Sequence, residues 1–121
     1  MTVFTRTLAD CTEILAGDKT ILRELLHPAR NQAAIGYSLA HAKLAQGTAS
    51  LPHRLKTSEV YYFISGQGRM HVDGESTVVG PEQALYVPPG AVQHLENAGK
   101  DELVFLCIVD PAWRLDDEEV L

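Results

Sequence analysis

Short apolar segments separated by turn residues characterise the chain from residue 35 onward. Asp73-Gly74 favours a tight hairpin, because both central residues of a type I′ turn need a positive φ. Segments of this length, spaced about every 8–12 residues with Gly, Pro or Asp in the gaps, predict an all-β sandwich or barrel. The predicted strands are IGYSLAHAKL (35–44), SEVYYFIS (58–65), RMHV (69–72), STVV (76–79), ALYV (84–87), VQHLEN (92–97) and LVFLCIV (103–109).

The segments at 58–65 and 103–109 are apolar on both faces. A sandwich with one solvated face does not require this, so closure of the sheet or a partner must cover the second face. Residues 20–27, TILRELLH, fit a helix and a strand equally well, and Pro28 ends whichever element forms. Residues 1–19 are predicted to be an irregular lead-in.

The composition is that of one globular domain spanning residues 1–121. Hydrophobic residues make up 45% of the chain and charged residues 21%, which excludes a disordered chain. Ten basic and 16 acidic residues give a net charge of -6, which repels a nucleic acid backbone. The apolar runs are too short to cross a membrane, and the N-terminus has no basic region followed by an apolar run. We therefore expect a cytoplasmic protein with no nucleic acid or membrane partner.

Cys11 and Cys107 are far apart in sequence and have no metal-type spacing. They are interpreted as two buried thiols in a reducing compartment, with a disulfide or a reactive thiol as the alternatives. Trp113 precedes the acidic run 116–119 and is predicted to be a packing anchor or a dimer contact, with the acidic run solvated.

Two segments carry the candidate chemistry. Residues 47–66 read Gly47, five residues, His53, one residue, Leu55, three residues, Glu59, six residues and Gly66. Residues 82–97 read Glu82, five residues, Pro88, one residue, Gly90, two residues, Gln93, three residues and Asn97. These spacings resemble the two motifs of the cupin family. The resemblance implies a single double-stranded β-helix, a jelly-roll type barrel over about residues 35–109, with an N-terminal segment and a C-terminal tail packed outside it.

The chain departs from those motifs at three positions. Leu55 stands where the first motif has its second histidine, and Glu82 stands where the second motif opens with glycine. Gln93 occupies the second motif's histidine position, and His94 follows one residue later. Because a shift of one residue turns a strand side chain to the other face, we expect Gln93 to face inward. A bulge after Gly90 would select His94 instead.

Alternate residues of a strand share a face, so Glu59, Tyr61 and Phe63 form one row, and His53 points with Leu55. The resemblance implies that these rows line the barrel and that His53, Glu59 and Gln93, or His94, hold a divalent metal ion. Imidazole nitrogen and carboxylate oxygen suit Zn, Fe, Ni or Mn, and three ligands leave an open position. Glu59 and Tyr61 are the candidate proton-transfer residues.

The other histidines carry weaker signals. His41 would supply a replacement nitrogen if its strand face is interior, and otherwise it is a surface or hydrogen-bonded residue. His71, just before the predicted hairpin, is expected to be exposed, and His27 beside Pro28 carries no chemical signal.

Two functions remain open from the sequence. One is a metal-dependent enzyme of dioxygenase, isomerase, epimerase or lyase type acting on a small molecule. The other is a small-molecule binding or sensing cupin without metal or catalysis. In both cases we expect a homodimer, because a twofold dimer is the commonest homo-oligomer and the two-sided apolar strands need cover.

Overall fold

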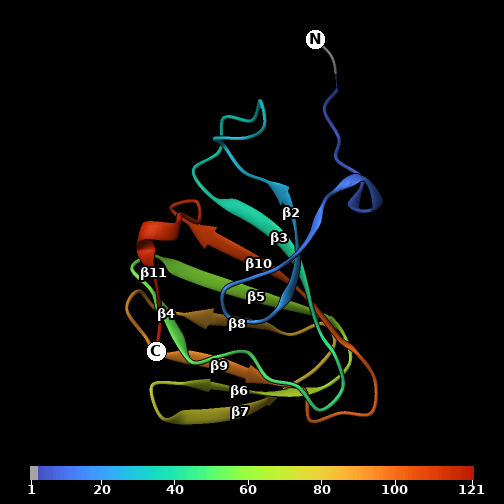
Figure 1. Cartoon of the computed structure of the whole chain (residues 1–121), viewed down its shortest axis with the longest axis vertical. Helices are drawn as coiled ribbons and strands as arrows, with labels where there is room; N and C mark the ends of the chain where they lie inside the picture. The colour runs from blue at the N-terminus through green and yellow to red at the C-terminus, as the bar shows by residue number, and fades with distance from the viewer. Residues whose placement is uncertain (1–2) are drawn as a thin grey trace.

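The computed structural model describes residues 3–121 as two antiparallel sheets (Figure 1). The chain is all-β, with two short 3₁₀ turns, η1 (Leu8–Asp10) and η2 (Leu115–Asp117). One sheet has the strand order β1-β2-β3-β10-β5-β8, and the other has the order β11-β4-β9-β6-β7. The six-stranded sheet contains β1 (Glu13–Leu15), β2 (Ile21–Leu26), β3 (Ser38–Leu44), β10 (Leu103–Asp110), β5 (Ser58–Ser65) and β8 (Ala84–Val87). The five-stranded sheet contains β11 (Glu118–Val120), β4 (His53–Leu55), β9 (Gln93–Glu96), β6 (Gly68–Val72) and β7 (Glu75–Val79).

The core lies between the two sheets and is built from alternate residues of their strands. Phe63 and Phe105 from the six-stranded sheet are 0% and 1% exposed, and Met70 and Leu95 from the five-stranded sheet are equally buried. The rings of Tyr61, Phe63 and Phe105 contact one another with centroids 5.6 to 6.0 Å apart. These aromatic contacts join β5 to β10 on the inner face of the six-stranded sheet.

All seven predicted strands form, and two of them, 58–65 and 84–87, begin and end where the pattern placed them. The ambiguous segment 20–27 is a strand, because β2 pairs with β3 along most of its length. The prediction that residues 1–19 are irregular was wrong in part. They contain η1 and β1, and β1 is held by pairing with β2 and by an ion pair between Glu13 and Arg23 at 3.3 Å. Residues 1–2 of this segment lie outside the described residues.

The segments flanking the barrel lie at its sheet edges, where they add strands. β1 and β2 extend one side of the six-stranded sheet, and β11 pairs with β4 at the edge of the other. Trp113 is an anchor within the chain, since its Nε1 donates to Glu118 at 2.7 Å and its carbonyl lies 2.8 Å from His27 Nε2. Both cysteines are buried free thiols, as predicted. No helix within residues 3–121 has the length and apolarity needed to cross a membrane.

Backbone conformation explains two of the motif positions. Gly66 has φ +84°, and a Cβ there would lie 2.5 Å from the carbonyl oxygen of Glu102, so only glycine fits. Glu82 has φ +66°, in the left-handed region that favours glycine. The predicted hairpin at Asp73-Gly74 also forms, with φ values of 48° and 83°. The second motif therefore usually opens with glycine because this position has a left-handed backbone. Glu82 keeps that backbone conformation at a cost in conformational free energy.

Candidate functional site

Three strands bring polar side chains together inside the barrel. His53 on β4, Glu59 and Tyr61 on β5, and Gln93 on β9 are between 1% and 7% exposed. His53 and Gln93 are direct partners across β4 and β9, and Glu59 and Tyr61 share one face of β5 as their spacing predicts. Gln93 faces the interior, whereas His94 lies on the other face of β9.

Three of these residues form a buried chain of hydrogen bonds. The Tyr61 hydroxyl donates to Gln93 Oε1 at 2.5 Å, and Gln93 Nε2 donates to Glu59 Oε1 at 2.9 Å. Burial raises the pKa of Glu59 to about 7, although the hydrogen bond from Gln93 and the nearby His53 oppose the shift. Burial also raises the pKa of Tyr61 and of the Cys107 thiol well above their usual values, with the Glu59 charge adding to both. Tyr61 is thus a fixed donor, while Glu59 exchanges its proton near neutral pH.

Beside these hydrogen-bonded residues, His53 contacts a residue that the sequence did not single out. Its Nδ1 lies 2.7 Å from the Leu51 carbonyl, and its Nε2 lies 3.5 Å from Asp18 Oδ2. Because a carbonyl oxygen only accepts hydrogen bonds, Nδ1 carries a proton. The other ring nitrogen, Nε2, is the one near Asp18. Asp18 sits in the turn between β1 and β2, held by a backbone bond from Leu51 to the Asp18 carbonyl at 2.7 Å. In the sequence, Gly17-Asp18 indicated only a turn. The contact between Asp18 and His53, which are far apart in the chain, makes Asp18 part of the site.

The interior residues do not fit a metal ion as they are arranged. The second imidazole of the usual ligand set is absent, because Leu55 occupies its position and is buried. The Gln93 oxygen accepts from Tyr61, and its amide is bound to Glu59. Within residues 3–121, no group of three His, Cys, Asp or Glu residues that includes His53 or Glu59 has its ligand atoms all within 4.8 Å of one another. The donor set instead fits hydrogen bonding and proton transfer.

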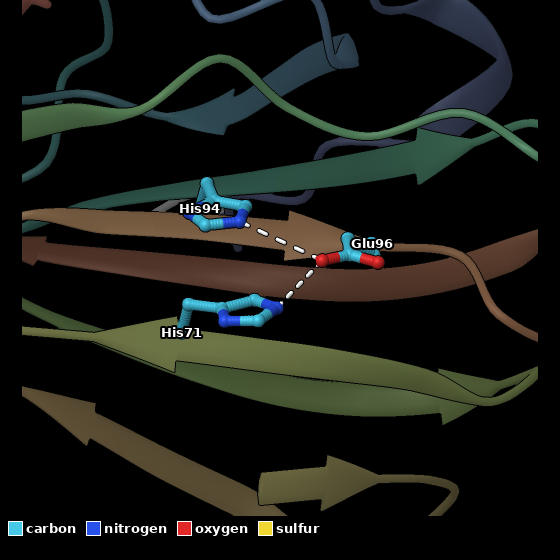
Figure 2. Close-up of side chains that lie close together, drawn as sticks. All are labelled: His71, His94 and Glu96. Carbon is cyan, nitrogen blue, oxygen red and sulfur yellow. Dashed lines mark ion pairs between the residues drawn. The ribbon is translucent and has the colours of Figure 1, made fainter. Parts of the chain in front are cut away.

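A second cluster lies on the outer face of the five-stranded sheet, between β6 and β9. His71 and His94 are direct partners across these strands, and their rings stack with centroids 4.1 Å apart and planes 5° apart. Glu96 Oε1 lies 2.6 Å from His71 Nε2 and 3.6 Å from His94 Nε2. Figure 2 shows both rings directed toward this carboxylate. One ligand atom from each of the three residues fits within 4.8 Å, so this His-His-Glu cluster is a possible metal-binding group.

Two histidines therefore differ from their sequence interpretations. The prediction that His71 is exposed was wrong, since its side chain is only 27% exposed and packs against His94. The suggestion that His41 supplies an interior nitrogen is also wrong. On β3 the buried positions are Ser38, Ala42 and Leu44, and His41 falls on the opposite face.

Residues 40–109 match the family described as Cupin domain. The chain is also 37% identical over 105 residues to "Uncharacterized protein MJ1618" of Methanocaldococcus jannaschii, a match that covers 86% of this chain and 83% of that protein. The chain belongs to the cupin family. The motif resemblance and the two-sheet architecture agree with this membership.

Several solved structures superpose on most or all of this chain. Pac13, described as a unique nucleoside dehydratase, gives a TM-score of 0.79 at 19% identity and covers 99% of this chain and 92% of its own. A Streptomyces PAC13 variant solved with uridine gives 0.80 at 20% identity, covering 100% of this chain and 92% of that one. A predicted oxalate decarboxylase from Thermotoga maritima gives 0.77 at 20% identity, covering 89% of this chain and 99% of that one. At these identities the likeness shows the fold.

Proposed function

We propose that this cupin binds a small, neutral, hydroxyl-bearing molecule in its barrel and transfers protons to or from it. The observation that carries the proposal is the buried chain from Glu59 through Gln93 to Tyr61, with His53 and Asp18 beside it. This proposal narrows the chemistry to isomerase or lyase reactions, in which one proton is removed and another delivered.

Each residue has a distinct part in this proposal. Glu59 is the proton carrier, because a pKa of about 7 leaves both of its forms populated at neutral pH. Tyr61 keeps its single proton because its pKa is raised, and it donates that proton to Gln93 Oε1. Its oxygen therefore accepts a hydrogen bond from the hydroxyl of the bound molecule. Gln93 fixes the orientation of both groups through its two hydrogen bonds. The Asp18 side chain, 14% exposed, lies nearer the surface than the other members of the group.

The charge of the interior favours a neutral ligand. The Asp18 carboxylate is near enough to raise the pKa of Glu59, so the two acidic groups already repel each other. None of the buried residues between 3 and 121 is a lysine or arginine. An anion such as oxalate would add a third negative group without a partner cation. The likeness to a nucleoside dehydratase and to a structure solved with uridine makes uridine a suitable neutral probe.

The competing proposal is a divalent metal ion held by His53, Glu59 and Gln93. The motif spacing and the direct pairing of His53 with Gln93 favour it, but Gln93 would have to release its oxygen from Tyr61. Metal analysis of purified protein separates the two proposals. One metal ion per chain that disappears in His53→Ala, while the variant stays folded, would support the interior metal.

Ligand binding is tested by following the protein's backbone amide signals by NMR during addition of uridine, glucose or oxalate. We expect uridine to shift signals of β5 and β9, and Tyr61→Phe to weaken binding by about ten-fold through loss of one buried hydrogen bond. Tyr62→Phe is the matched control, because Tyr62 lies on the outer face of the same strand and is 40% exposed. Binding of oxalate alone, binding only after addition of Mn²⁺ or Fe²⁺, or no interior shift with either neutral probe would refute the proposal.

The same samples separate an enzyme from a binding protein. New proton signals from the small molecule over time indicate turnover, and Glu59→Gln is expected to retain binding and lose that turnover. Binding without turnover in the wild type would favour the non-catalytic alternative.

A further inference from the structure

We propose that His71, His94 and Glu96 form a binding site for a borderline divalent cation such as Zn²⁺, Co²⁺ or Ni²⁺ on the outer face of the five-stranded sheet. This site is separate from the barrel interior and does not depend on the function proposed above. It is built on two neighbouring strands, β6 and β9.

The spacing of the donor atoms suits a shared ion. Two ligand atoms bound tetrahedrally at about 2.0–2.1 Å lie about 3.3 Å apart. The two observed distances from Glu96 Oε1 to the imidazole nitrogens, 2.6 and 3.6 Å, lie on either side of that value. Two imidazoles and one carboxylate form a donor set that borderline divalent cations accept, and three protein ligands leave a position for water.

A second observation points to an absent partner at the same place. His71 Nε2 is a buried atom without a hydrogen-bond partner, although Glu96 Oε1 lies 2.6 Å away. The contact is close, but its geometry is not that of a hydrogen bond. A cation bound by both this nitrogen and the Glu96 oxygen would give each atom a partner with good geometry.

The arrangement of Arg69 leaves the carboxylate available. Arg69 lies directly across from Glu96 in the pairing of β6 with β9. Its Nη1 instead donates to Ser76 on β7 at 3.0 Å. Among the described residues, Glu96 makes ion pairs with His71 and His94 and none with Arg69. The Arg69 side chain therefore extends toward β7 and does not pair with Glu96.

The stacked rings need a small rotation to share an ion. In parallel rings the nitrogen lone pairs lie in two separate parallel planes, so the rings must tilt toward each other for both to point at one cation. The side chains of His71 and His94 are 27% and 30% exposed, which leaves room for that tilt. The bound cation would join β6 to β9.

The test is titration of untagged protein with Co²⁺ alone, followed by visible absorption, and with Zn²⁺ alone, followed by calorimetry. We expect one ion per chain and a rise in Tm on saturation, because a ligand bound only by the folded state stabilises it. His71→Ala, His94→Ala and Glu96→Gln should each weaken binding by more than about ten-fold, since losing a direct ligand costs at least as much as losing a supporting one.

Two control variants make the outcome specific. His41→Ala removes a half-buried imidazole from the other sheet, and His53→Ala removes the interior imidazole. Both should bind Co²⁺ as the wild type does. Binding that survives all three outer-face substitutions, binding lost in His53→Ala, or no saturable binding by the wild type would overturn the inference. Circular dichroism of each variant verifies that loss of binding is not loss of fold.

Discussion

Replacing Glu59 by glutamine should change how the protein's stability depends on pH. Burial raises the pKa of this carboxyl from its ordinary 4.5 to about 7 in the folded state. The folded chain therefore holds this proton at pH values where the unfolded chain has lost it. The contribution of Glu59 to stability is fully present below pH 4.5, falls as the pH rises toward 7, and is gone above that.

The size of the effect follows from the gap between the two pKa values. From 4.5 to about 7, at 1.36 kcal/mol for each pH unit, the loss amounts to about 3 kcal/mol. Glutamine is neutral at every pH, and its side-chain oxygen is placed to accept the hydrogen bond that Gln93 Nε2 now gives to Glu59. Relative to wild type, Glu59→Gln should therefore gain about 3 kcal/mol of unfolding free energy between pH 4.5 and pH 8.

Urea unfolding at several pH values between 4.5 and 8.5, followed by circular dichroism and by the fluorescence of Trp113, measures this difference. Other carboxylates also titrate in this range, so the informative quantity is the free energy of the variant minus that of the wild type. Glu75→Gln, at an exposed position on β7, is the matched control and should follow the wild-type slope. Parallel curves for Glu59→Gln and wild type would show that Glu59 is charged in the folded state at all these pH values.

Three further predictions concern stability and assembly. Glu82→Gly should raise the Tm by about 4 °C, because the left-handed backbone at φ +66° costs a non-glycine residue about 1 kcal/mol; an unchanged or lower Tm by calorimetry would contradict this. Gly66→Ala should lower the unfolding free energy by about 2–4 kcal/mol, since its Cβ would meet the Glu102 carbonyl at 2.5 Å, and a wild-type urea midpoint would show that the turn relaxes. Light scattering should give twice the mass of the 121-residue chain, because Tyr62 and Tyr86 leave apolar surface on the outer face of the six-stranded sheet; a monomer mass at micromolar concentration would refute the dimer.

The strands of the barrel were predictable because their apolar residues and turn residues are local signals. Glu59 and Tyr61 share a face in any regular strand, and counting from Pro88 to Asn97 was sufficient to orient Gln93. The segment 20–27 was ambiguous because eight residues carry too little periodicity. Its strand conformation comes from pairing with β3, in which Ile21 opposes Lys43. β1 has no local signal, since its pairing partners determine it.

The parts of the two clusters that sequence missed depend on contacts between distant residues. His71 and His94 meet because β6 and β9 pair in one register, although β7, β8 and their turns separate them in the chain. Asp18 reaches His53 because the Leu51 backbone holds its turn. Residue spacing does not indicate either contact. The sequence therefore predicted an exposed His71 before the hairpin and gave Asp18 no role beyond its turn.

Strand β9 places Gln93 and Leu95 in the interior and His94 and Glu96 on the outer face. This alternation ties both clusters to the length of one loop, residues 88–92, which joins β8 to β9. Adding or deleting a single residue there would exchange the faces, putting an imidazole and a carboxylate in the core, unless a bulge absorbed the change. A change of two residues would restore both faces. We therefore expect the length of the 88–92 loop to change by two residues at a time, both in natural variants and in loop grafts. Because both clusters depend on β9, neither can change its register without the other.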